Sequence, residues 1–270
     1  MLDALSYDFI QNAIIAGILV SIASGIIGSL IVVNRMVFLA GGIAHTSYGG
    51  IGIAVYFGIP IFLGASLFAV AAALLISFIT LKQRERTDTF IGLIWAVGMA
   101  IGILFVDITP GYNVDLMSYL FGSILAVSSE DIWFMSTLVI VIICIVTFCY
   151  RDILAVSYDS EYALLRGVHV KFFYTLILVL SALTVVIAIK IVGLILVIAL
   201  LTIPIYIAER LSNSLYNMMF LSAVISTVFT LFGLYMSYSF DITSGASIIL
   251  VSAISLVLFL LFLRFKNIMK

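Results

Sequence analysis

NAIIAGILVSIASGIIGSLIVVN, residues 12–34, is a long apolar run without a single charged side chain. A bilayer core of about 30 Å needs about 20 helical residues, so this run is long enough to cross a membrane. Similar runs recur along the chain, which is 65% hydrophobic and only 9% charged. A soluble protein of 270 residues cannot hide that much apolar surface. We therefore predict an all-α polytopic membrane protein that forms one integral membrane domain over residues 1–270.

Nine apolar segments are candidate transmembrane helices. They are residues 12–34, 37–58, 61–81, 90–106, 132–150, 172–189, 191–208, 216–238 and 247–263. The region 172–208 is too long for one helix but leaves little room for a turn near Lys190 and Gly193. The prediction is therefore eight to nine crossings. Nine would place the N-terminus outside and the C-terminus in the cytoplasm.

Basic residues gather in the loops of one predicted face, with Lys190 as the exception. The others are Arg35, Lys82, Arg84, Arg86, Arg151, Arg166, Lys171, Arg210, Arg264, Lys266 and Lys270. An excess of Lys and Arg marks the cytoplasmic side, so this pattern predicts the orientation in the plasma membrane. The opposite face collects Asp3, Asp8, Asp107, Asp115, Glu130, Asp131 and Asp241. An acidic outer mouth favours a protein that receives cations, and we expect Lys190 to snorkel to the outer interface.

Residues 116–127 (LMSYLFGSILAV) are apolar but would measure only about 18 Å as a helix, too short to cross. With both flanks outside, they predict a re-entrant or buried half-helix that lines a cavity. Asp115 at its outer start can cap the helix or meet an incoming cation. Asp107 and Asp241 also lie at the outer mouth, where ordinary solvated loop acids are the simpler interpretation.

His45 is the one histidine inside a predicted span, and Gly41, Gly49 and Gly52 lie near it at helical spacing. Small residues let helix backbones approach, and an ionisable ring among them faces protein or a cavity. Contact with a passing cation and plain packing against a backbone carbonyl both remain open. A lone imidazole is too little for a structural metal cage. Pro204 is expected to kink the span 191–208.

The longest cytoplasmic loop, residues 151–171, contains a predicted short helix over 159–168. Asp159 and Glu161 mark its start, Arg166 lies near its end, and Gly167 is suited to terminate it. The helix can be a docking element or an ordinary solvated connector. No lysine is followed by Ser or Thr, so the chain lacks a P-loop for ATP. If ATP drives transport, another chain must hydrolyse it, and nothing in the sequence indicates a nucleic-acid partner.

Four stretches together resemble the membrane permeases of bacterial ABC importers for zinc, manganese and iron(II). They are GGIAHTSYGGIGIA (41–54), NVDLMSYLFGSILAVSSEDI (113–132), IKIVGLILVIALLTIPIYIAERL (189–211) and FDITSGASIIL (240–250). They occur in family order across most of the chain. One departure concerns residue 41, where the family often has Asp four residues before the histidine and this chain has Gly.

The resemblance implies a homodimer of permeases, a cytoplasmic ABC ATPase dimer and an extracytoplasmic metal-binding protein. It makes the 159–168 segment a coupling helix seated on the ATPase. It also makes His45 and Asp115 the best metal-path residues, with Asp107 and Asp241 beside the path. The glycines of the 41–54 stretch and Pro204 become packing or gating positions. The expected activity is transport without covalent chemistry or a resident cofactor. The likeness of the 113–132 segment puts zinc ahead of manganese and iron(II).

Two other classes of function compete with this one. An ATP-independent secondary cation transporter would need carboxylates in the middle of its spans to couple protons or sodium. The acids of this chain stand at predicted span ends instead. A membrane scaffold without a substrate would not need a glycine-rich span with an inward-facing histidine.

Overall fold

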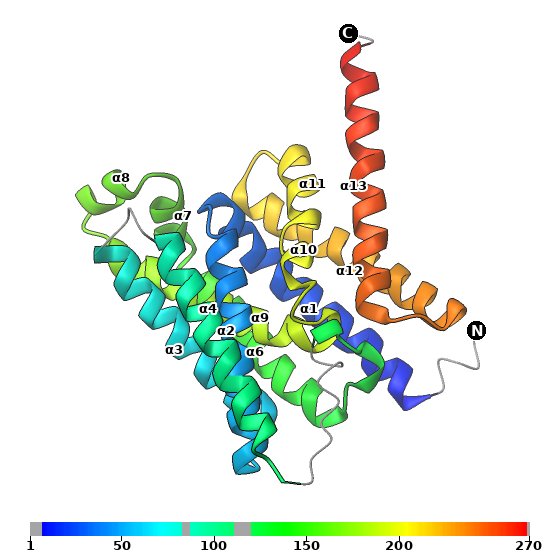
Figure 1. Ribbon diagram of the computed structural model, residues 1–270. Coiled ribbons are helices and arrows are strands. Elements are labelled where there is room, and N and C mark those ends of the chain that lie inside the picture. Colours follow the sequence, from blue (N-terminus) through cyan, green and yellow to red (C-terminus); the bar gives the residue numbers. More distant parts are fainter. Residues whose placement is uncertain (1–6, 83–86, 111–119, 269–270) are drawn as a thin grey trace.

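The computed structural model describes residues 7–82, 87–110 and 120–268, and within these ranges all regular secondary structure is helical. Eight helices of the described chain are long and apolar enough to cross a membrane (Figure 1). They are α1 (Asp8–Val33), α2 (Val37–Phe57), α3 (Ile61–Lys82), α4 (Thr87–Asp107), α6 (Ser129–Phe148), α9 (Val170–Val192), α12 (Leu215–Phe240) and α13 (Ser244–Ile268). The predicted all-α polytopic fold is thus confirmed.

The predicted helix over 191–208 is wrong as a single span. Helix α9 continues through Lys190 to Val192 and stops at Gly193, whose backbone has φ 81° and ψ 164°. Two short helices follow, α10 (Val197–Leu200) and α11 (Ile203–Leu211), drawn in yellow in Figure 1. Pro204 does not kink a span but lies in the first turn of α11, where its missing N–H is not needed.

Helix α1 is a central element, because α12, α9 and α6 all pack against it. Three hydroxyl pairs join its buried face to α12. The pairs are Ser21–Thr230, Ser24–Ser226 and Ser29–Ser222, with oxygen–oxygen distances of 3.2, 3.4 and 3.0 Å. Between them, Gly25 lies so close to the backbone of Ala223 that no side chain fits. Hydroxyls within a bilayer need protein partners, so this ladder sets the register of the two helices.

The two ends of the bundle can be assigned from contacts. At one end, the Asn12 amide near the start of α1 donates to the Val127 carbonyl, and the Ile124 N–H donates to Ser244 at the start of α13. At the other end, Asn34 just after α1 donates to Ser157. The last turn of α13 therefore lies far from the start of α1, as Figure 1 shows.

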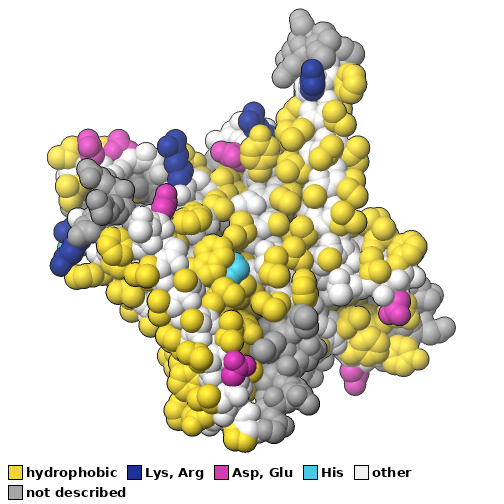
Figure 2. All heavy atoms as spheres, in the orientation of Figure 1, with side chains coloured by type: hydrophobic (Ala, Val, Ile, Leu, Met, Phe, Trp, Pro, Cys, Tyr) yellow, Lys and Arg dark blue, Asp and Glu magenta, His cyan; other side chains and the backbone are white. Residues whose placement is uncertain are grey.

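The charge distribution differs between these ends. In the face drawn in Figure 2, Lys and Arg side chains lie in the upper part and at the left edge, together with some acidic side chains, whereas the charged side chains of the lower part are all acidic. Lys190, the exception in the sequence, pairs with Asp131 at an Nζ–Oδ2 distance of 3.3 Å. Its charge is thus partly neutralised by a carboxylate of the end near Asn12, which we call the outer end in keeping with the positive-inside prediction.

Candidate transport path and coupling site

His45 lies on α2 and stacks on Trp95 of α4, with ring centroids 3.8 Å apart and planes 15° apart. The Trp95 indole N–H donates to the Met99 sulfur at 3.1 Å. The His45 Nδ1 atom is buried without a hydrogen-bond partner among the described residues. If His45 were only a packing residue, its ring would be expected to hydrogen-bond a neighbouring backbone carbonyl, and no such bond is seen at Nδ1. A buried ring nitrogen without a partner is unusual and marks His45 as a candidate functional residue.

Glycines bring the backbones of α2 and α4 close together around His45. A Cβ atom on Gly49 would lie 2.8 Å from the Gly98 carbonyl oxygen, and Gly52 contacts Gly102 more closely still. Residue 41 faces another element, since a Cβ there would lie 2.7 Å from the Ile198 side chain of α10. Ile198 thus takes the room that the family's Asp would need, which gives a physical reason for Gly41.

The predicted acids do not join His45 within the described chain. Asp107 is the last residue of α4, Asp241 caps α12 in a left-handed conformation, and both are exposed. Asp115 lies outside the described residues. Within the described ranges no cluster of three or more His, Cys, Asp or Glu side chains can hold a metal ion. Within the described ranges, His45 therefore does not belong to a metal-binding cluster.

Three glycines from three of the family-like stretches meet at the outer end of the bundle. Gly122 and Gly193 both have positive φ, 77° and 81°, and their backbones are in direct contact. Gly245, near the start of α13, touches the carbonyls of Phe121 and Val192. A side chain on any of the three would overlap backbone atoms of a neighbour. We call this contact the three-glycine junction.

The three-glycine junction also corrects the predicted half-helix over 116–127. Residues 116–119 lie outside the described chain. The rest is helical at Leu120 and Phe121, breaks at Gly122, and continues as the 3₁₀ helix η3 (Ile124–Ala126). The break lets the Ser123 N–H donate to the Lys190 carbonyl at 3.2 Å. This segment is therefore held by the end of α9 rather than continuing as one helix.

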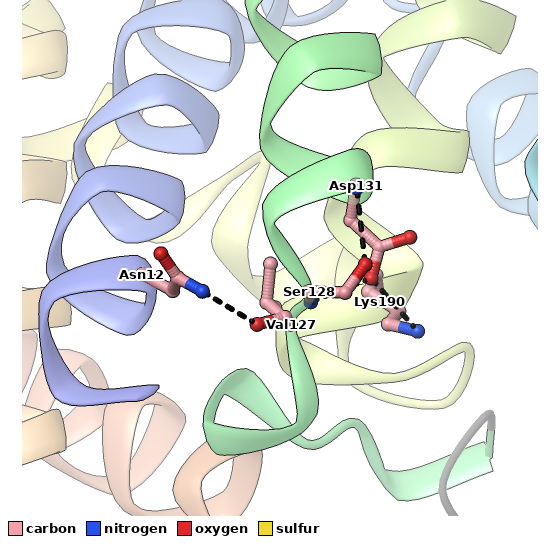
Figure 3. A network of polar contacts seen from close by, with 5 residues as sticks. All are labelled: Asn12, Val127, Ser128, Asp131 and Lys190. Carbon is pink, nitrogen blue, oxygen red and sulfur yellow. Dashed lines mark hydrogen bonds and ion pairs between the residues drawn. The ribbon is translucent and has the colours of Figure 1, made fainter. Parts of the chain in front are cut away.

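A polar network lies beside the junction (Figure 3). Ser128 and Asp131 form a capping box at the start of α6, with bonds of 2.9 and 3.2 Å. The Asp131 carboxylate also pairs with Lys190 of α9, and Asn12 of α1 donates to the Val127 carbonyl at 3.4 Å. The network thus connects the outer ends of α1, α6 and α9.

At the opposite end, the predicted short helix is present as α8 (Ser160–Leu165). The Asp159 Oδ1 atom accepts from the backbone N–H groups of Glu161 and Tyr162, at 3.1 and 2.9 Å. Arg166 follows the last turn, and Gly167 leaves the helix with φ 80°. Sequence reasoning missed the preceding helix α7 (Tyr150–Tyr158), which packs with α8 against α9.

The outer surface of α8 is more apolar than a solvated connector needs. Leu165 is 88% exposed, and Tyr158, Tyr162 and Leu164 are also exposed. The charged side chains of Glu161 and Arg166 lie exposed beside them. Clustered apolar side chains with a charged rim are typical of a surface that another protein covers.

Comparisons with known proteins agree with this arrangement. Residues 6–263 match the ABC 3 transport family. The chain is 37% identical to the manganese transport system membrane protein MntC of Listeria monocytogenes, over 93% of this chain and 89% of that protein. It is 47% identical to an uncharacterized membrane protein of Synechocystis, over 98% of this chain and 94% of the relative.

A solved structure supports the same conclusion. PsaBC from Streptococcus pneumoniae, in complex with Fab, superposes with a TM-score of 0.87 at 32% identity, covering 96% of this chain and 93% of the other. An inward-facing putative metal-chelate type ABC transporter shares the fold, with a TM-score of 0.74 at 17% identity. The match across nearly the whole chain confirms the membership that the sequence motifs indicated: this protein is a membrane permease of the ABC 3 transport family.

Proposed function

We propose that this chain is the membrane-spanning subunit of an ATP-driven importer of a divalent transition metal. The observation that carries the proposal is the family match over residues 6–263, together with near full-length similarity to a manganese transport protein. The sequence has no P-loop, so hydrolysis falls to a separate ABC ATPase dimer. The remaining partners are a second copy of this permease in the plasma membrane and an extracytoplasmic metal-binding protein.

The identity of the transported metal is proposed from fewer observations than the transport function itself. Likeness of the 113–132 segment to zinc-importer permeases favours zinc, whereas three relatives at 34–37% identity carry manganese in their names and others at 36–37% are named only as probable metal transport proteins. We place manganese first because the similarities to those three relatives extend over more than nine-tenths of the chain. Imidazole suits zinc whereas manganese prefers oxygen ligands, so the single ring of His45 by itself favours zinc, and the order proposed here depends on the relatives.

A single histidine such as His45 fits a transient contact on a transport path better than a tight metal-binding site. A path must bind an ion strongly enough to admit it and weakly enough to release it. One imidazole nitrogen meets that requirement, whereas a four-ligand cage would trap the ion. The stacking of His45 on Trp95 fixes the ring plane and leaves Nδ1 unpaired in the described structure. In the proposed mechanism, this nitrogen is a transient contact as the spans alternate between outward and inward access.

The exposed face of α8 supports coupling to the ATPase. Helices α7 and α8 pack on α9, and the far end of α9 reaches the three-glycine junction. A displacement of α8 by a closing ATPase dimer is therefore transmitted along α9 to the outer end of the bundle. In this mechanism, Asp159 and Gly167 define the helix ends, and Leu165 with its neighbours forms the contact.

Metal accumulation in cells lacking this chain tests the proposal. The native gene should restore manganese uptake, whereas Leu165→Asp should insert normally but fail, because the carboxylate disrupts the apolar contact. Leu165→Met is the matched control and should retain uptake. Uptake that persists without any partner ATPase would support a secondary transporter and contradict the proposal. Restoration of zinc but not manganese uptake would reverse the order of the two metals.

A further inference from the structure

A groove of about 720 Å³ lies between α6 and α12, and His45 is not among its lining residues. Both helices pack on α1, which forms the floor of the groove. Its lining residues are Ile18, Ile22, Ile26, Ile143, Val146, Thr147, Tyr150, Tyr216, Met219, Phe220, Ala223, Val224, Thr227 and Val228. None of them belongs to the proposed metal path.

The groove walls are almost entirely apolar along the membrane spans. Ile18, Ile22 and Ile26 follow one another at helical spacing on α1, and each is half-buried. The Thr227 hydroxyl donates to the Ala223 carbonyl at 2.8 Å, so its hydrogen-bond donor is already used. All three helices qualify as membrane spans, so the groove lies at the depth of the hydrocarbon. Packed interiors avoid voids of this size, and an apolar chain is the matching filler.

One end of the groove is polar, and it is the end near the basic loops. Tyr150 opens α7, and Tyr216 is the second residue of α12. Both tyrosines line the groove, and Tyr150 is half-buried, which raises the pKa of its phenol. Tyrosine rings gather at membrane–water interfaces, so this end lies at headgroup level.

Positive charge at the same end favours an anionic headgroup. Arg151 follows Tyr150 and is exposed, while its neighbour Asp152 is half-buried. The start of the 26-residue helix α12 also points its positive dipole end here. An apolar groove that opens into a bilayer and ends in tyrosines beside an arginine matches a phospholipid in shape and in charge.

We propose that the groove binds one anionic phospholipid of the cytoplasmic leaflet. One acyl chain lies on the α1 isoleucines between α6 and α12, and the phosphate lies near Arg151 and the start of α12. The lipid would hold α6 and α12 at their present spacing, while the hydroxyl pairs hold α12 against α1. The proposal does not depend on the identity of the transported metal.

The test uses the complete transporter reconstituted in vesicles of phosphatidylcholine and phosphatidylglycerol, then extracted in detergent. Native mass spectrometry counts the lipids that remain bound. We expect retained phosphatidylglycerol in the native protein and its loss in Val224→Trp, because the indole fills the groove. Val257→Trp is the matched control, since Val257 is 56% exposed on α13, outside the groove. Ile22→Phe obstructs the floor and provides a second variant should the first fail to fold.

A separate substitution tests the preference for an anionic headgroup. Arg151→Gln should lower the ratio of phosphatidylglycerol to phosphatidylcholine by about fivefold, the factor that corresponds to about 1 kcal/mol for one basic residue near an anionic surface. Arg264→Gln on α13 should leave the ratio unchanged. Equal lipid retention in native, Val224→Trp and Ile22→Phe proteins would overturn the site. An unchanged lipid ratio in Arg151→Gln would overturn the anionic preference.

Discussion

Replacing Gly193 by Ala should destabilise the protein sharply, because this residue holds the three-glycine junction together. Its backbone conformation, φ 81° and ψ 164°, is essentially reserved for glycine and costs about 1–3 kcal/mol with a side chain. The new methyl group would also overlap the carbonyl carbon of Phe121 and the nitrogen of Gly122. Overpacking of this kind adds about 1–3 kcal/mol. The two effects together predict a loss of about 2–6 kcal/mol.

Two other glycines separate backbone strain from crowding. Gly58 also has positive φ, 66°, but a Cβ there meets nothing within 4 Å, so Gly58→Ala should cost only about 1–2 kcal/mol. Gly92 has neither problem, and Gly92→Ala should be neutral or slightly stabilising. Thermal unfolding in detergent, followed by loss of the monodisperse chromatographic peak, ranks the three variants. A Gly193→Ala protein as stable as Gly58→Ala would refute the junction's role.

Three further outcomes are expected. Gly167→Pro should abolish metal uptake while leaving the chain inserted, since proline cannot adopt the positive φ that ends α8; unchanged uptake would remove the coupling role. His45→Ala should reduce uptake without lowering the amount of protein in the membrane, whereas a purely structural histidine would lower both together. Asp131→Ala should cost about 2 kcal/mol and Lys190→Ala about 1 kcal/mol, because only the former also removes the carboxylate that accepts from the Ser128 N–H in the α6 capping box. A reversed order in thermal unfolding would contradict this.

Most of the fold could be predicted because span length and apolarity are local properties of the chain. The run 12–34 became α1 with small shifts at its ends, and most other predicted spans behaved likewise. The prediction of one span over 191–208 is wrong because apolarity does not indicate where the backbone turns. Only the tertiary contact with Gly122 explains why Gly193 takes a positive φ and stops the helix.

The site could be predicted less completely. The ends of α8 follow from local signals, since Asp159 caps its own helix and Gly167 leaves it. The partner of His45 could not be deduced, because Trp95 comes from another helix and no sequence spacing relates the two rings. The sequence shows Lys190 as an exception to the charge pattern, but its pairing with Asp131 depends on how α6 and α9 pack.

The central claim is ATP-driven import through this chain, and transport by purified components tests it most directly. The permease, its partner ATPase and the binding protein would be reconstituted in vesicles, with radiolabelled manganese supplied on the side of the binding protein. We predict accumulation that requires ATP, the ATPase and an intact α8, and that falls when His45 is replaced by Ala. Accumulation that proceeds equally without ATP, or with the permease omitted, would contradict the account.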